Sequence, residues 1–147
     1  MSYLKLLKEA LDTPYKISMK KTSAAHYDGS VKLPDGGYLD LTVFGENDKV
    51  HFPERDGLSW KTVFTALPGS PTAVVDEMKA FATVVAGLKQ VIKKEDPKFI
   101  DIRAEKHRWF KDRGTQYSKM LSKHLGSAYD IRVKNRGRET MFYLTKK

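Results

Sequence analysis

The chain has 147 residues, 40% of them hydrophobic, which is the right size for one compact domain with a sizeable core. It contains no cysteine, so disulfides and thiolate chemistry are excluded. The formal net charge of +9 favours a partner that carries phosphates or carboxylates. No run of about 18 apolar residues is present that would span a bilayer. The opening "MSYLKLLKEAL" alternates charge with leucine instead of building a signal sequence, so we expect a soluble, intracellular protein with no membrane contact.

The first half of the chain predicts one helix followed by antiparallel strands. Leu4, Leu7 and Leu11 recur at spacings of three and four in "SYLKLLKEALDTP", which predicts a short amphipathic helix that ends before Pro14. From residue 15 the period changes to two, and "YKISMKKT" predicts a half-buried strand. "SVKL" and "YLDLTVF" flank the turn sequence "PDGG", and "LSWKTVFTAL" supplies a further strand. We therefore expect an antiparallel meander of about four strands over residues 15–67.

The second half predicts two helices, each followed by strands. "AVVDEMKAFATVVAGLKQVIKKED" carries a broad apolar stripe at helical period, with Thr72 as its N-cap and Lys93 and Lys94 at its C-terminal end. "PKFIDIRA" predicts a short strand that this helix covers, and "KDRGTQYSKMLSKHLG" predicts a second helix that ends at Gly126. "YDIRV" and "TMFYL" flank "KNRGRE" and predict a terminal hairpin with a basic tip. The apolar face of the second helix consists of Phe110, Tyr117, Met120, Leu121 and Leu125.

No linker, repeat or low-complexity segment divides the chain, so residues 1–147 are expected to form a single domain. The expected fold class is α/β (α+β): a central, mostly antiparallel sheet with an N-terminal helix, a long helix, a second C-terminal helix and a terminal β-hairpin.

The order of these elements resembles the GNAT N-acetyltransferase fold. The stretches "FATVVAGLKQVIKKEDPKFIDIRAE", "RGTQYSKML" with Arg113 and Tyr117, "YDIRV" and "MFYL" also resemble the small GNAT-like proteins of tailed bacteriophages. The likeness covers residues 58–147 and is one of residue types and spacings. It implies a GNAT-like single domain of phage origin in the host cytoplasm or the virion, with a role in host takeover, anti-defence or virion assembly.

Tyr117 is the candidate catalytic residue that this resemblance implies. In acetyltransferases of this fold the second helix often carries a tyrosine that protonates the leaving thiolate of coenzyme A, and Tyr117 falls at the matching place. A phenol with a pKa near 10 is able to donate that proton. Tyr117 also lies on the apolar stripe of its helix, where an aromatic residue is more often part of the core. We expect a core residue and no catalytic residue, with an acyl-CoA-dependent N-acetyltransferase as the alternative.

The loop that would hold the pyrophosphate of coenzyme A lacks the expected pattern. Such acetyltransferases present Arg or Gln followed by closely spaced glycines, whose backbone N–H groups cradle the phosphates. Here "TALPGSPTAVV" has the single glycine Gly69, and Pro68 and Pro71 have no N–H. We therefore expect no cofactor, with Gly69 and Ser70 as the alternative binding residues for acetyl-CoA.

Other enzyme motifs and metal sites are not indicated. The sequence has no GxSxG elbow, P-loop or HExxH motif. Its histidines show neither HxxxH nor HxH spacing, so no metal site is expected. They are His26, His51, His107 and His124.

The positive charge is concentrated in the last third of the chain, which we expect to be the functional surface. Residues 1–60 hold 8 Lys or Arg against 9 Asp or Glu, residues 61–97 hold 5 against 4, and residues 98–147 hold 14 against 5. Such a surface suits non-specific nucleic acid or an acidic host or phage protein, and the simpler alternative is a solvated face that keeps the protein soluble. The candidate anion-binding residues are Arg103, Lys106, Arg108, Lys111, Arg113, Lys119, Lys123, Arg132, Lys134, Arg136 and Arg138.

Overall fold

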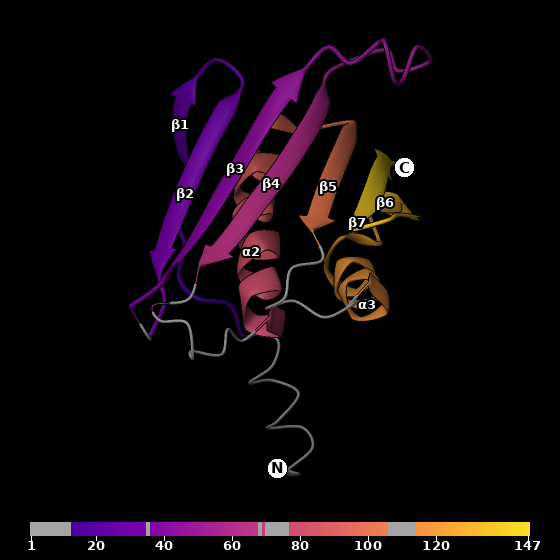
Figure 1. The fold of residues 1–147 in the computed structure, drawn as a ribbon. Coiled ribbons are helices and arrows are strands. Elements are labelled where there is room, and N and C mark those ends of the chain that lie inside the picture. The colour runs from indigo at the N-terminus through magenta and orange to yellow at the C-terminus, as the bar shows by residue number, and fades with distance from the viewer. Residues whose placement is uncertain (1–12, 35, 68, 70–76, 106–113) are drawn as a thin grey trace.

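A computed structural model describes most of the chain (Figure 1). The described residues are 13–34, 36–67, 69, 77–105 and 114–147. The predicted N-terminal helix, the predicted N-cap Thr72 and the predicted core residue Phe110 lie outside these ranges.

The described strands form one seven-stranded sheet in the order β1-β2-β3-β4-β5-β7-β6. Neighbours are antiparallel except for β4 and β5, which are parallel. The expected mostly antiparallel α+β architecture is therefore confirmed. The strands are β1 (Lys20–Ser23), β2 (His26–Lys32), β3 (Tyr38–Glu46), β4 (Ser59–Leu67), β5 (Phe99–Glu105), β6 (Tyr129–Arg136) and β7 (Glu139–Lys146).

Two described helices, α2 (Glu77–Glu95) and α3 (Gly114–Leu125), lie on the same face of the sheet (Figure 1). Phe81 of α2 and Tyr117 of α3 stack with ring centroids 4.0 Å apart, and both rings contact Phe142 of β7. The handedness of crossover connections explains this arrangement. The connections from β4 to β5 and from β5 to β6 each join parallel strands, and both move toward the β6 edge of the sheet. Because such crossovers are right-handed, both helices lie on the same side of the sheet.

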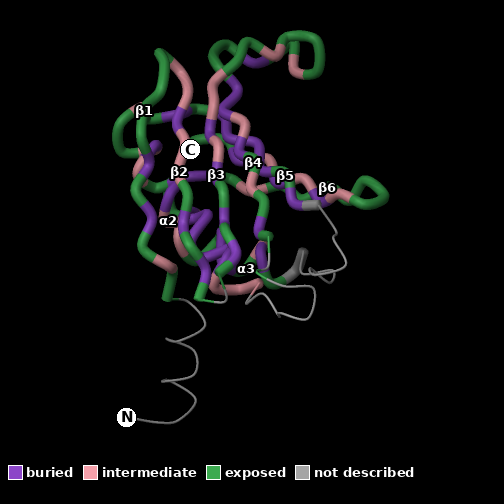
Figure 2. The backbone as a smooth tube through the Cα atoms, turned by 60° about the vertical axis from the view of Figure 1, so that its left-hand side comes forward, coloured by how far each residue is buried: buried purple, intermediate pink, exposed green. Residues whose placement is uncertain are grey.

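Alternating apolar residues of the strands form the core with these helices (Figure 2). Leu39, Leu41 and Val43 of β3 are fully buried beneath α2. The predicted apolar stripe of α3 is confirmed, because Tyr117, Met120, Leu121 and Leu125 are all buried. No helix in the described part of the chain is both long enough and apolar enough to cross a bilayer.

Two of the hairpin turns contain a glycine with a left-handed backbone. Gly36, between β2 and β3, has φ of 90°, and Gly137, between β6 and β7, has φ of 58°. An L side chain rarely adopts this conformation, so glycine suits both positions. The predicted turns at "PDGG" and "KNRGRE" are confirmed at these two places.

The strand predicted from residue 15 begins only at Lys20, and that boundary was wrong. The preceding segment instead runs along α2, where the side-chain amide of Gln90 accepts a hydrogen bond from the Met19 N–H (2.9 Å) and donates one to the Ile17 carbonyl (2.8 Å). The backbone N–H of Tyr15 donates to Thr83 Oγ1 at 2.8 Å. A period of two marks extended chain, but it does not say whether a strand or a helix supplies the backbone partners.

Two glycines make this segment fit between the sheet and the helix. A Cβ atom at Gly29 of β2 would lie 2.5 Å from Met19 Sδ, and one at Gly87 of α2 would lie 3.1 Å from the same atom. The missing side chains therefore leave the space that the buried Ile17 and Met19 fill.

Candidate anion-binding face

The face of the sheet opposite the helices, called the open face below, carries a row of basic residues on β6. Ile131 and Val133 lie opposite the buried Leu144 and Phe142 of β7, so they belong to the helix side. The alternate residues of β6 point the other way because successive side chains of a strand project to opposite faces. These are Arg132, Lys134 and Arg136, named the cation row, opposite Tyr143, Met141 and Glu139.

The cation row is exposed and is not neutralised within the described structure. Among the described residues, Arg132, Lys134 and Arg136 make no side-chain hydrogen bond or ion pair, and the same holds for Arg138 just beyond the turn. Residues two apart on a strand lie about 6.5 Å apart. The row therefore presents regularly spaced positive charge, and the turn between β6 and β7, which carries Arg138, projects beyond the end of the strand (Figure 2).

Arg103 lies on the same face, but unlike the cation row it has an acidic partner within the protein. It sits on β5 opposite Met141, and Met141 in turn lies opposite Lys134, so Arg103 extends the basic surface across three strands. Its guanidinium forms an ion pair with Glu139 of β7, which neutralises part of its charge. Arg103 is therefore a weaker candidate for an external anion than the cation row.

The remaining predicted cations are not placed beside the row. Lys119 and Lys123 are exposed on α3, which packs on the opposite side of the sheet from the open face. Four predicted cations and the alternative cofactor residue Ser70 lie outside the described residues, and Gly69 is described and exposed. The four cations are Lys106, Arg108, Lys111 and Arg113.

A buried ion network borders the basic surface, and sequence reasoning missed it. The loop between β3 and β4 carries Arg55, whose guanidinium donates to both carboxylate oxygens of Asp101 at 2.8 and 2.9 Å and to Ser59 Oγ at 2.7 Å. Lys61 Nζ of β4 lies 2.7 Å from Asp48 and 3.0 Å from Asp101. Arg55 and Asp101 are only 6% and 2% exposed. The signal that pointed to such a network is the acid in the apolar strand sequence "FIDI", since a buried carboxylate needs a partner.

Aromatic rings enclose the Arg55 guanidinium. Its central carbon lies 3.5 Å from the ring centroid of Phe52 and 4.9 Å from that of Phe99. Phe52 in turn packs edge-on against Tyr143, at 5.6 Å between centroids, and Tyr143 is the residue opposite Arg132. The loop is thus fixed against β5 and β7 beside the cation row, and the charge of Arg55 is used internally.

The network also shifts the titration of its members. The hydrogen bond from Lys61 holds the pKa of Asp48 well below its usual range, with a further contribution from His51. Burial lowers the pKa of Lys61, but its hydrogen bonds to Asp48 and Asp101 outweigh burial and raise the pKa overall. Both groups therefore stay charged at neutral pH. This agrees with a structural salt bridge and not with a proton-transfer site.

A second feature is the separation of the two parallel strands. Their ladder ends at Val63 and Arg103, although β4 continues along β3 to Leu67 and β5 continues along β7 to Glu105. Tyr117 lies on the helix side of this sheet, where its ring stacks on Phe81. Its side chain is only 4% exposed. Tyr117 is thus a buried aromatic residue, as its place on the apolar stripe predicts.

No protein-family model matches this chain, and no curated protein matches its sequence. Within the described ranges, no three His, Asp or Glu side chains gather closely enough to hold a metal ion.

Proposed function

We propose that this chain is a non-catalytic, GNAT-like binding protein that holds a nucleic-acid backbone, without sequence preference, on the open face. The observation that carries the proposal is the cation row: three exposed, unpartnered cations on one face of one strand, within the described part of the chain. Arginine suits phosphate because its planar fork donates two parallel hydrogen bonds. A regular row of cations suits a polymer whose negative charges also repeat.

The GNAT-like part of the proposal is supported by topology. A meander of four strands is followed by a helix, a parallel strand, a second helix and a final antiparallel pair, which is the element order of that fold. The phage origin is supported by the resemblance of the stretches quoted above, and the proposal includes a location in the host cytoplasm or the virion. A role in host takeover or anti-defence is part of the proposal because the resemblance to phage proteins implies it.

The first experiment measures the affinity for a short DNA duplex as a function of salt concentration. Each phosphate contact that is lost lowers the slope of log K against log salt by about 1. We expect the triple variant of the cation row to lower the slope by about 2 to 3. The variant is Arg132→Ala, Lys134→Ala and Arg136→Ala.

A matched control removes the same charge from the other end of the sheet. Lys16, Lys20 and Lys32 are exposed there and have no side-chain partner in the described structure, and their triple alanine variant should keep the slope. An equal loss of slope in both variants would show that binding depends on net charge alone, and it would overturn the assignment of the cation row as the binding site. Absence of binding at low salt would overturn nucleic acid as the ligand and leave an acidic protein. A pull-down from infected cells, with and without nuclease, then separates these two partner classes.

A second candidate function is an acyl-CoA-dependent N-acetyltransferase, favoured by the separation of β4 and β5 beyond Val63 and Arg103. Parting parallel strands leave a crevice at their carboxyl ends, where α/β sheets often bind ligands. Tyr117 would then be the acid, but its burial against Phe81 disfavours contact with a thiolate. We expect acetyl-CoA not to raise the melting temperature, and a clear rise would favour this function over the first.

A further inference from the structure

The outer edge of β2 is only partly covered by β1. The two strands pair at Lys20 with Asp28, at Lys21 with Tyr27 and at Ser23 with His26, and the pairing goes no further. Residues 29–32 of β2 continue to pair with β3 on the inner side. Of these residues, Ser30 and Lys32 direct their backbone N–H and C=O groups to the outer side, because the bonded pairs Ala25–Gly45 and Leu33–Gly37 orient the odd-numbered residues toward β3. In the described part of the chain, these outer groups meet no strand and no other hydrogen-bonding partner. Such an edge is a template for another strand.

The edge stays open because the chain before β1 is held elsewhere. The side-chain amide of Gln90 in α2 accepts from the Met19 N–H and donates to the Ile17 carbonyl, and Thr83 accepts from the Tyr15 N–H. The side chains of Ile17 and Met19 are buried between the sheet and α2, so this segment cannot also extend β1 along β2. The gap between the segment and the strand edge is therefore built into the fold.

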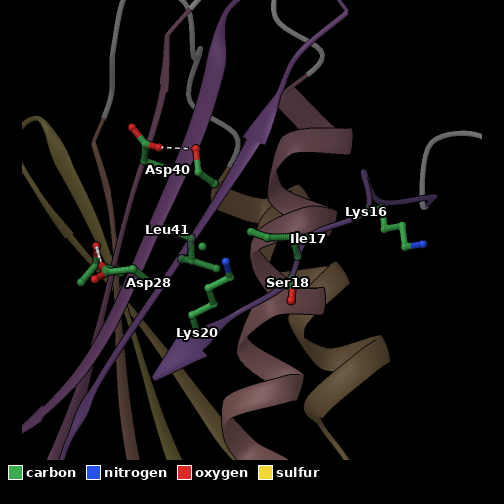
Figure 3. A pocket seen from close by; sticks show the side chains of 10 residues that line it. Lys16, Ile17, Ser18, Lys20, Asp28, Asp40 and Leu41 are labelled. Atoms are coloured by element: carbon green, nitrogen blue, oxygen red, sulfur yellow. Dashed lines mark hydrogen bonds between the residues drawn. The ribbon is translucent and has the colours of Figure 1, made fainter. Parts of the chain in front are cut away.

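A groove of about 850 Å³ occupies this gap (Figure 3). One wall is made by Lys16, Ser18 and Lys20, and the other wall carries Asp28, Ser30 and Asp40 on the open face of β2 and β3. In Figure 3 the ammonium group of Lys16 points away from both carboxylates. Lys20 marks the end of the groove, where β1 takes over the pairing with Asp28.

The two carboxylates of the groove are fixed by their neighbours. Asp28 accepts a hydrogen bond from Thr42 Oγ1 at 2.9 Å and lies 3.1 Å from His26 Nε2, and Asp40 accepts a hydrogen bond from Ser30 Oγ at 2.7 Å. An ionised carboxylate has about four acceptor sites, so both retain capacity for a further donor. A residue placed opposite Ser30 on an added strand would project beside these two acids, whereas a residue opposite Val31 would project to the apolar helix side.

We propose that this edge binds an extended peptide segment of a partner protein as an additional strand, antiparallel to β2. Antiparallel addition continues the line of β1, and the peptide backbone supplies the partners that Ser30 and Lys32 lack. The favoured peptide carries Lys or Arg opposite Ser30, an apolar residue opposite Val31, and an acidic residue opposite Lys32. In chain order this reads acidic, apolar, basic. The site is separate from the cation row, which lies at the far edge of the sheet.

The probe is the capped peptide Ser-Gly-Glu-Val-Lys-Val-Gly-Ser, titrated into the full chain and followed by the backbone amide signals in NMR. We expect saturable shifts at residues 29–32 and at the facing residues 16–20. A peptide with Glu and Lys exchanged should bind several-fold more weakly, since cross-strand charge pairs contribute about 0.2–1 kcal/mol each. A peptide N-methylated at Glu and Lys, the residues opposite Lys32 and Ser30, loses the backbone donors that face β2 and should not bind.

Protein variants test the carboxylates independently of the peptide. Asp28→Asn and Asp40→Asn together should abolish the preference for the peptide with Lys opposite Ser30, while Asp130→Asn, an exposed acid on β6, should leave it unchanged. Shifts that are absent at residues 29–32, or equal for the N-methylated peptide, would overturn the proposal. Concentration-dependent shifts at this edge and at β6 without peptide would identify the occupant as a second copy of the chain, and this too would overturn it.

Discussion

Arg55 and Asp101 form a buried two-point ion pair although they are 46 positions apart in the chain. The pair joins the loop before β4 to the middle of β5, and it therefore spans the parallel seam of the sheet. Because both groups are removed from water, their interaction is sensitive to the loss of either partner.

Asp101→Asn should lower the free energy of unfolding by about 3–5 kcal/mol, since it leaves a buried guanidinium without a counter-charge. The double variant Arg55→Met and Asp101→Leu should recover most of that loss, because it removes both buried charges together. Urea denaturation of the three proteins measures these differences. Lys98→Met, which breaks the exposed ion pair with Asp56, is the matched control and should cause no measurable change. Equal losses in the single and double variants would contradict the assigned role of charge pairing.

Asp48 predicts how stability depends on acid. The hydrogen bond from Lys61 lowers the pKa of Asp48 in the folded state, so its contribution is complete above its unfolded pKa and is lost as pH falls toward the folded value. The wild-type free energy of unfolding should therefore decline below about pH 4. Asp48→Asn should be less stable at neutral pH and should show a shallower decline. Parallel denaturation curves between pH 2 and 7 test this, and an unchanged slope would exclude Asp48 as a contributor.

Tyr129 makes the corresponding prediction at alkaline pH. Its hydroxyl donates to the carbonyl oxygen of Pro97 at 2.6 Å, and burial, aided by the charge of Asp96, raises its pKa to about 12. A raised pKa gives a contribution that is complete below the unfolded value and is lost as pH rises through the folded one. Wild-type stability should therefore fall between about pH 10 and 12 more steeply than that of Tyr129→Phe. Parallel pH profiles for the two proteins would disprove this assignment.

Tyr117 distinguishes a core residue from a catalytic acid. Tyr117→Phe keeps the ring that stacks on Phe81, so it should change stability far less than Tyr117→Ala, which should cost about 3–5 kcal/mol. Thermal and urea unfolding of both variants measure the difference. If the alanine variant were as stable as the phenylalanine variant, the ring would not contribute to the core.

Local patterns predicted most of the fold because they report directly on burial. The alternation in "YLDLTVF" places Leu39, Leu41 and Val43 on the buried face, and the helical spacing of Met120, Leu121 and Leu125 predicts the packed side of α3. The order of the elements then restricts the sheet to few topologies. The start of β1 at Lys20 could not be predicted from local patterns. It depends on the hydrogen bond from the Met19 N–H to Gln90, which is 71 positions away in the chain.

The candidate site was less predictable, because the sequence gives the number of charged residues but not the side of the sheet that each one faces. Arg132 and Lys134 could be assigned to one strand face from their spacing alone, and they do project from one face. Their separation from Lys119 and Lys123 depends on which side of the sheet α3 packs, which local spacing does not contain. The Arg55 network was missed for the same reason, since its loop must first reach β5.

The parallel seam between β4 and β5 also has a consequence for the order of folding. The seam holds five register pairs, Ser59 with Phe99 through Val63 with Arg103, whereas the β2–β3 and β6–β7 hairpins join segments that are close in sequence. Contacts between distant segments form late because loop closure must precede them. We therefore expect the two hairpins to form before the seam, which Arg55 and Asp101 close from 46 positions apart.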